Sequence, residues 1–192
     1  ERLENFASIV SHDLRNPLNV AQGYIGMLQE DINRDELRLV DNALDRMGVL
    51  ITELLELAQS DREIGEMTAV PLKTIAEDAW GNVSTPDAEL DISELNRRVM
   101  ADDSRLQQLF ENLFRNAVEH AGPDVHVTVN TTTGGFYVAD DGPGIPLDKR
   151  ERVFDTGYTT EEKGTGFGLS IVQQIVAGHN WEIQITESTD GG

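Results

Sequence analysis

The 192-residue sequence has no cysteine, which excludes disulfide bonds and thiolate metal sites. It also has no run of about eighteen apolar residues and no recognisable signal peptide, so we expect a soluble, cytoplasmic piece without direct membrane contact, from a full-length protein that could be tethered to a membrane. Aromatic residues make up only 6%, and the apolar total of 39% predicts a compact but lean core in one or two small domains. Because the first residue is Glu1 rather than methionine, we expect a fragment of a longer protein.

Basic residues are scarce as well. The 15 lysines and arginines are outnumbered by 35 acidic residues, and the formal net charge is −20. Such a surface repels the phosphates of nucleic acids and of anionic lipids, so neither is an expected partner. The charge fits an ordinary acidic protein or a halophilic one. We favour the halophilic interpretation, because self-repulsion at this charge is costly unless salt screens it.

Residues 1–62 carry two helical patterns separated by a polar turn at residues 31–35. Apolar residues recur in steps of three and four, which is typical of helices packed in a bundle. A helical hairpin cannot bury both of its faces alone, so we expect two copies to form a four-helix bundle and the protein to be a homodimer. The apolar positions are Leu3, Ala7, Val10, Leu14, Leu18, Ala21, Ile25 and Leu28 in the first pattern, and Leu37, Val40, Leu44, Met47, Ile51, Leu54 and Ala58 in the second.

Residues 63–70 are polar and are expected to form a linker, after which strands and helices alternate. This alternation predicts an α/β sandwich over residues 71–192, with its helices on one face of a sheet. Either Ser104 or Asp103 is expected to cap the longest helix. We expect helices at residues 71–80, 104–120 and 169–177, and strands at residues 87–92, 98–101, 125–130, 135–140 and 181–187.

His12 is the first candidate for chemistry. At about 100° per residue it lies nearly opposite the apolar stripe of its helix and is expected to face solvent. Asp13 can reach the imidazole edge, Asn16 lies one turn further along the same face, and Pro17 should bend the helix. An exposed imidazole can accept a phosphoryl group when a carboxylate holds its other ring nitrogen. On spacing alone, an ordinary surface histidine before a kink fits equally well.

A second set of candidates lies in the expected sandwich. Asn112 and Asn116 share one edge of the 104–120 helix, and amide oxygens are suitable ligands for Mg²⁺, although a pair of surface amides is the commoner explanation. Asp140 ends an expected strand, where a carboxylate can accept a hydrogen bond from an adenine amino group. Gly142 and Gly144 follow it and let the backbone approach a flat ligand closely.

Three further glycines, Gly164, Gly166 and Gly168, precede an expected helix. A glycine-rich entry to a helix N-terminus is a natural phosphate site, through its free amides and the helix dipole. The spacing is not the dinucleotide-binding fingerprint and follows a polar loop rather than a strand. The phosphate-binding loop of P-loop proteins is also missing from the sequence.

Together these motifs resemble a known family. The run from Ser11 to Leu18 matches the H-box of two-component sensor histidine kinases. The motifs around Asn112, Asp140, Phe154 and Gly164 follow in the order of the N-box, G1, F-box and G2 of its ATPase domain. The resemblance covers most of the chain. It implies a helical hairpin that dimerises into a four-helix bundle, followed by a Bergerat-type ATP-binding α/β sandwich.

The resemblance also implies roles. His12 would be autophosphorylated from Mg-ATP with help from Asp13, and the phosphoryl group would pass to an aspartate of a response-regulator receiver domain. Asp13 and Asn16 would support dephosphorylation of that partner. In the ATPase domain, Asn116 would bind Mg²⁺ and Asp140 would recognise adenine. Gly164, Gly166 and Gly168 would contact phosphates and form the lid, and Asn112 would line the same pocket.

The sequence departs from the family in three places. Glu119 stands where many members have lysine, so a phosphate-facing cation is missing unless Lys163 or Arg115 replaces it. The lid between Phe154 and Gly164 is short, and the family's last core strand is expected to be truncated. Two rival hypotheses remain: an ATP-gated conformational clamp of the Bergerat type, which would lack an H-box, and a non-catalytic dimeric scaffold, which Glu119 alone supports.

Overall fold

The computed structural model describes residues 18–23, 25, 40, 42–44, 47, 48, 51, 64–83, 87–155, 157–159 and 166–187. The chain divides into two compact units. The first covers residues 1–62 and 159–167, and the second covers residues 63–158 and 168–192. No helix in the described ranges is long and apolar enough to span a membrane.

In the first unit, the described residues between 18 and 51 are helical. Leu18 and Leu44 are buried, at 6% and 8% exposure, as their places in the two apolar patterns predicted. A Cβ atom on Gly48 would lie 3.3 Å from Cδ2 of Leu18, so the two helical segments pack closely here. These contacts agree with the predicted hairpin.

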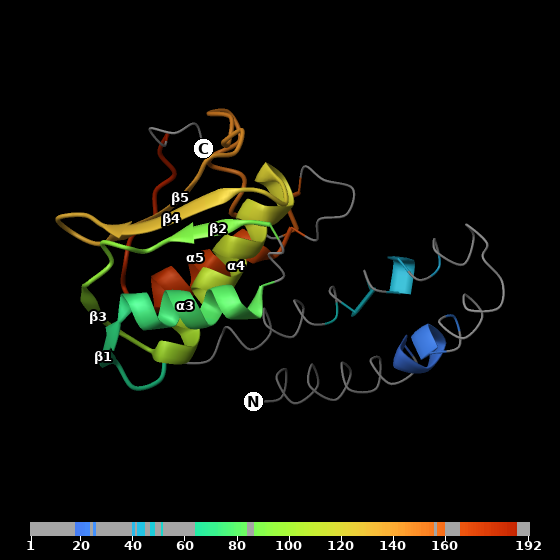
Figure 1. The fold of residues 1–192 in the computed structure, drawn as a ribbon, viewed down its shortest axis with the longest axis horizontal. Coiled ribbons are helices and arrows are strands. Elements are labelled where there is room, and N and C mark those ends of the chain that lie inside the picture. The colour runs from blue at the N-terminus through green and yellow to red at the C-terminus, as the bar shows by residue number, and fades with distance from the viewer. Residues whose placement is uncertain are drawn as a thin grey trace. The chain divides into compact units, whose positions relative to one another are not determined.

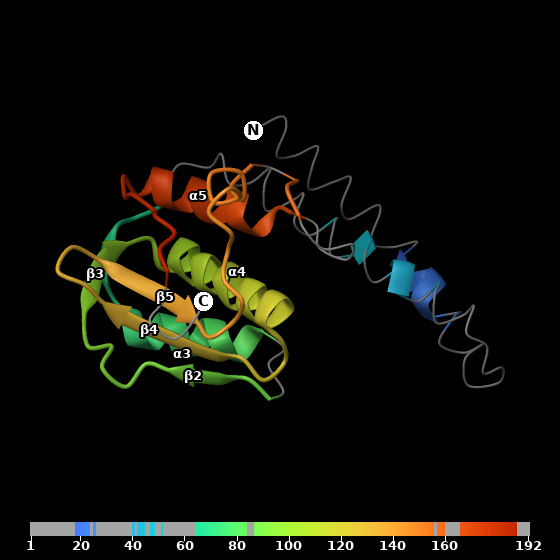
Figure 2. The ribbon, with the colours of Figure 1, turned by 90° about the horizontal axis from the view of Figure 1, so that it is seen from above.

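The second unit is an α/β sandwich. Its three-stranded sheet has the order β2-β4-β5, with β2 parallel to β4 and β4 antiparallel to β5, while β1 and β3 form a separate antiparallel pair. Helices α3, α4 and α5 cover one face of the three-stranded sheet (Figures 1 and 2), as the alternation of elements predicted. The elements are β1 Thr68–Pro71, α3 Leu72–Asn82, β2 Glu89–Asp91, β3 Arg98–Ala101, α4 Asp103–Ala121, β4 His126–Thr131, β5 Phe136–Asp140 and α5 Gly168–Gly178.

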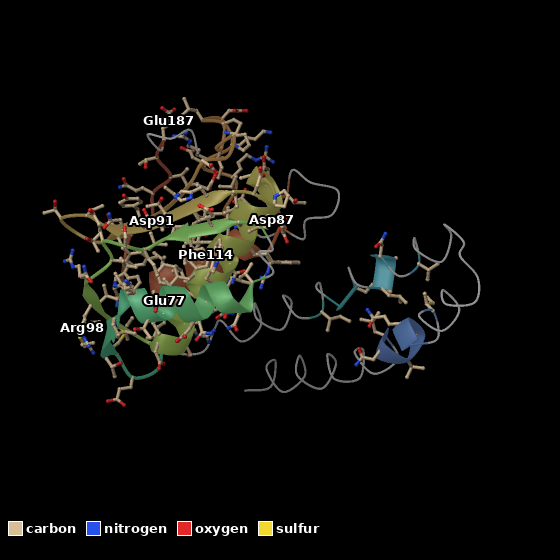
Figure 3. The ribbon with its side chains drawn as sticks, in the orientation of Figure 1. Glu77, Asp87, Asp91, Arg98, Phe114 and Glu187 are labelled. Atoms are coloured by element: carbon tan, nitrogen blue, oxygen red, sulfur yellow. The ribbon has the colours of Figure 1, made fainter. Side chains whose placement is uncertain are left out.

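Four aromatic side chains of the second unit pack together between its helices and its sheet. Phe110 and Phe114 of α4 stack with their ring centroids 5.6 Å apart, and Trp80 of α3 meets Phe114 edge-on at 5.2 Å. Phe110 also contacts Phe136 of β5 at 5.5 Å, which joins α4 to the sheet. Figure 3 shows Phe114 in this interior, where it is fully buried. Aromatic side chains bury large areas, so a lean composition still supplies a continuous core.

Two predictions about secondary structure are wrong: the strand at residues 181–187 and the capping residue of α4. Residues 181–187 alternate in burial as a strand would, and Trp181 packs on Phe136 at 5.9 Å, but the segment has no ladder of hydrogen bonds to a described strand. An alternation of period two shows that successive side chains point to opposite faces of the segment. It does not show that the backbone pairs with another strand. The cap of α4 is Asp102, one residue before the predicted candidates, and its carboxylate accepts a hydrogen bond from the Arg105 amide.

The predicted linker over residues 63–70 also extends too far. Residues 68–70 belong to β1, where Thr68 lies opposite Ala101 and Val70 opposite Val99 of β3. Val70 is buried, at 5% exposure. The polar composition of this stretch concealed a short strand, because its pairing partner lies about thirty residues away in sequence and leaves no local periodicity.

Candidate functional site

The amphipathic character of α4 explains where the two asparagines lie. Its apolar face, which includes Leu109, Phe110 and Phe114, is buried, and Asn112 follows the same side of the helix with only 2% exposure. The Nδ2 atom of Asn112 donates to the Gln108 carbonyl at 2.9 Å. The alternative explanation of a surface amide is therefore wrong for Asn112, because this amide is part of the domain interior.

Two amide atoms of this pair have no hydrogen-bond partner within the described part of the chain. They are Oδ1 of Asn112 and Nδ2 of Asn116, and both are buried. An unsatisfied buried polar group costs about 1–3 kcal/mol, so a native protein rarely leaves two of them side by side without a use. A bound ligand with both a donor and an acceptor, or with coordinated water, would satisfy them.

The N-terminus of α5 lies directly against these amides. A Cβ atom on Gly168 would lie 3.2 Å from Oδ1 of Asn116 and 3.4 Å from Oδ1 of Asn112. Gly168 is the first residue of α5, where the backbone amides have no partner inside the helix and the dipole favours negative charge. Residues more than fifty positions apart in the sequence thus place two amide side chains beside a helix N-terminus, a position where anions commonly bind in proteins.

Asp140 is the last residue of β5. Its Oδ1 accepts a hydrogen bond from the Gly142 amide at 2.9 Å, which closes a tight turn. A Cβ atom on Gly142 would lie 2.4 Å from Cβ of Ala121, so only glycine lets this turn approach the end of α4. Packing against α4 therefore explains glycine at position 142, and the predicted close approach of a flat ligand to Gly142 stays a prediction.

Gly144 and Gly166 both have a left-handed backbone, with φ of 67° and 76°. Side chains with a Cβ rarely adopt this conformation, which explains glycine at both positions. Gly166 belongs to the first compact unit and Gly144 to the second. The catalytic candidates His12, Asp13 and Asn16, together with Gly164 and Lys163, lie outside the described residues.

The site fits a magnesium-bound nucleotide in its donor chemistry. Amide oxygens are hard ligands, and Mg²⁺ keeps waters and phosphate oxygens as its other ligands. In the described ranges no three carboxylate or imidazole side chains gather as a metal site, so an ion held by Asn116 would depend on phosphates and water. Glu119, two residues before the C-terminal end of α4, is exposed, and Arg115 is half-buried.

Sequence reasoning missed a buried polar pair, Asp102 and His179. Asp102 precedes α4 and His179 follows α5, at 9% and 5% exposure. Burial raises the pKa of Asp102, but hydrogen bonds from the Ser104 hydroxyl and from the Arg105, Gly65 and Ser104 amides outweigh it and hold this pKa below its ordinary value. The capping signal came within one residue of Asp102, whereas nothing local pointed to His179.

Two family models match successive parts of the chain. The His Kinase A (phospho-acceptor) domain matches residues 2–63, and the Histidine kinase-, DNA gyrase B-, and HSP90-like ATPase matches residues 101–192. Phytochrome-like protein Cph1 of Synechocystis sp. is 32% identical over 98% of this chain and 28% of its own length. The methanogenesis regulatory histidine kinase FilI of Methanothrix harundinacea is 30% identical over 98% of this chain and 23% of its own length.

A crystal structure of histidine kinase ThkA in complex with response regulator protein TrrA aligns with 98% of this chain and 58% of that chain, at a TM-score of 0.62 and 23% identity. This likeness supports the fold. The phosphoacceptor and ATPase matches, in this order, define the class: the chain belongs to the two-component sensor histidine kinases. It spans about a quarter of the length of the curated relatives named above.

Proposed function

We propose that this chain is the catalytic core of a sensor histidine kinase, which transfers the γ-phosphoryl group of ATP to His12 and then to an aspartate of a response-regulator receiver domain. The observation that carries the proposal is the buried, unsatisfied amide pair of Asn112 and Asn116 against the N-terminus of α5. A phosphate ligand there would accept hydrogen bonds from backbone amides of the first turn of α5.

In the proposed reaction, an imidazole nitrogen of His12 attacks the γ-phosphorus of ATP. A phosphorus–nitrogen bond forms, the bond to the bridging oxygen of ADP breaks, and ADP leaves. The carboxylate of Asp13 would accept a hydrogen bond from the other ring nitrogen. This contact would fix the tautomer and stabilise the positive charge that develops on the imidazole. Mg²⁺, held by Asn116 and the phosphates, would neutralise charge on the transferring group, and the rest of catalysis is positioning.

Asp140 is proposed to recognise adenine through its carboxylate at the end of β5. Its Oδ1 is already used by the Gly142 amide, so Oδ2 is the oxygen proposed for the adenine amino group. Gly144, Gly164, Gly166 and Gly168 are proposed to shape the loop and helix terminus around the phosphates. Asp13 and Asn16 would also support dephosphorylation of the receiver domain.

The core is proposed to act as a homodimer through its N-terminal hairpin. Val20, Val40 and Met47 are 58%, 46% and 45% exposed in the single chain. Val40 and Met47 belong to the predicted apolar seam, which one hairpin leaves uncovered and a second copy would bury. The proposed activity would be cytoplasmic, because it needs ATP and a receiver-domain partner. The phosphoacceptor match speaks against the rival conformational clamp.

The test is autophosphorylation with γ-labelled ATP and Mg²⁺ in high KCl, with wild type, His12→Gln and the matched control His126→Gln. His126 is an exposed histidine of β4 that pairs with Glu89 at 3.5 Å. We expect acid-labile, base-stable label on wild type and on His126→Gln, and none on His12→Gln. If wild type binds ATP but takes no label, the scaffold hypothesis replaces the kinase.

A further inference from the structure

Asp102 receives hydrogen bonds from two separate segments of the second unit. Its Oδ1 accepts from the Ser104 hydroxyl at 2.7 Å and from the Arg105 amide at 3.2 Å, which caps α4. Its Oδ2 accepts from the Gly65 amide at 2.8 Å. One carboxylate therefore divides its oxygens: one caps a helix, and the other holds a residue of the predicted linker.

His179 fixes the backbone of the same residue from the end of α5. The Asp102 amide donates to Nε2 of His179 at 3.1 Å, and Nδ1 of His179 lies 2.8 Å from the Ile175 carbonyl. The first contact needs an acceptor at Nε2 and the second a donor at Nδ1, so the two hydrogen bonds select the tautomer with hydrogen on Nδ1. Asp102 is thus held between the start of α4 and the end of α5.

The approach of Gly65 to Asp102 leaves no room for a side chain. A Cβ atom on Gly65 would lie 2.7 Å from Oδ2 of Asp102, far inside normal contact distance. Ile64 packs just as closely on α5, because its side chain lies 2.9 Å from where a Cβ on Gly178 would stand. Residue 65 is therefore held at the start of α4, and residue 64 packs on the end of α5. Residues 68–71 follow as β1.

We propose that Asp102 is a positioning residue for phosphotransfer: it anchors the connection between the two domains at Gly65, so that the pivot of the ATP-binding domain lies before Ile64. The proposal rests on the proposed kinase function, in which the nucleotide must reach His12. The proposal therefore places the pivot outside residues 64–70, although the sequence predicted a linker over residues 63–70.

The expected benefit is a higher effective concentration of the bound nucleotide at His12. A tethered group samples a volume that grows with the free length of its tether, and effective concentration falls roughly as the −3/2 power of that length. Releasing residues 64–67 lengthens the free connection. If it doubled that length, the rate of transfer would fall about threefold. Loss of orientation would add to this fall.

The main variant is Asp102→Asn. Asparagine caps helices about as well as aspartate, so α4 can keep its cap, while an amide nitrogen replaces the oxygen that accepts from Gly65. Because asparagine could turn over and lose the cap instead, Gly65→Ala is the second variant, and it acts from the linker side. The controls are Asp103→Asn, the same charge change at an exposed neighbouring residue, and Gly134→Ala, where a Cβ meets nothing within 4 Å.

Four quantities are measured on the whole chain: amide exchange at residues 64–66, the melting temperature, the KM for ATP, and the maximal autophosphorylation rate. We expect Asp102→Asn and Gly65→Ala to speed exchange at residues 64–66 and to lower the maximal rate at least threefold. The KM for ATP should stay within twofold of wild type. Both controls should match wild type in all four.

Other outcomes overturn the proposal in distinguishable ways. Unchanged exchange at residues 64–66 in both variants would show that the anchor does not exist. Faster exchange with an unchanged or raised rate would show that the anchor does not position the nucleotide, and a fall that appears only in the KM would assign a role in the nucleotide pocket instead. If wild type binds ATP without phosphorylating His12, the proposed kinase fails and the role in transfer fails with it, while exchange still decides whether the anchor exists.

Discussion

Replacing Gly168 by alanine adds a single methyl group at the point where α5 meets the asparagine pair. The new Cβ would lie 3.2 Å from Oδ1 of Asn116 and 3.4 Å from Oδ1 of Asn112. Carbon atoms in a packed interior prefer about 3.5–4.0 Å to their neighbours, so at least one amide must retreat by a few tenths of an ångström. This small displacement falls on the two side chains proposed to meet Mg²⁺ and the phosphates.

Two effects on stability oppose each other. Alanine is favoured over glycine within helices by about 0.5–1 kcal/mol, with less gained at a first position. Overpacking a close-packed site costs about 1–3 kcal/mol when neighbours cannot move freely. We expect Gly168→Ala to change the free energy of unfolding by less than about 2 kcal/mol. It should weaken Mg-ATP binding about tenfold or more, since about 1.4 kcal/mol of lost contact suffices for a factor of ten.

The assay is calorimetric titration with Mg-ATP beside urea unfolding of the same sample. Gly81→Ala is the matched control, because Gly81 is also a helical glycine, in α3, and a Cβ there meets nothing within 4 Å. It should gain up to about 1 kcal/mol of stability and bind as wild type does. If folded Gly168→Ala bound Mg-ATP as tightly as wild type, the asparagine pair would not lie in the nucleotide site.

Asn180 follows α5 with a left-handed φ of 55°, a conformation that asparagine and glycine tolerate and alanine does not. Asn180→Ala should therefore lower the free energy of unfolding by about 1 kcal/mol and Asn180→Gly should leave it nearly unchanged; equal effects in urea melts would refute this reasoning. The net charge of −20 predicts that the melting temperature rises steadily from low to molar KCl, and a flat thermal profile would contradict the halophilic interpretation.

The sequence predicted the architecture wherever one element carried its own periodicity. The 104–120 pattern located α4 to within one residue, because buried Leu106, Leu109 and Phe110 repeat at the helical period. The sheet strands near residues 126–140 followed from alternation in the same way. In the site, the pairing of Asn112 with Asn116 was visible as an i, i+4 spacing. Its burial was not, because it depends on α5, more than fifty residues further along.

What sequence reasoning could not reach depends on partners distant along the chain. Residues 181–187 alternate as a strand would but pair with no described strand, so the local pattern predicted a strand that is not there. Residues 68–70 do not alternate but pair with β3, so the local pattern missed the strand β1. Hydrogen-bond pairing across a fold is a non-local property.

The same reasoning explains why the linker was drawn too long. Flexible linkers and anchored connections share a polar composition, and here glycine at position 65 would be taken as a sign of freedom. The structure gives the opposite meaning: Gly65 is small because the backbone must come within hydrogen-bonding distance of Asp102. Under the proposed kinase function, the residue at which the free connection ends would set the volume that the bound nucleotide can sample. The proposed anchor at Asp102, a buried cap residue at the start of α4, would therefore act on phosphoryl transfer to His12 through the length of the free connection.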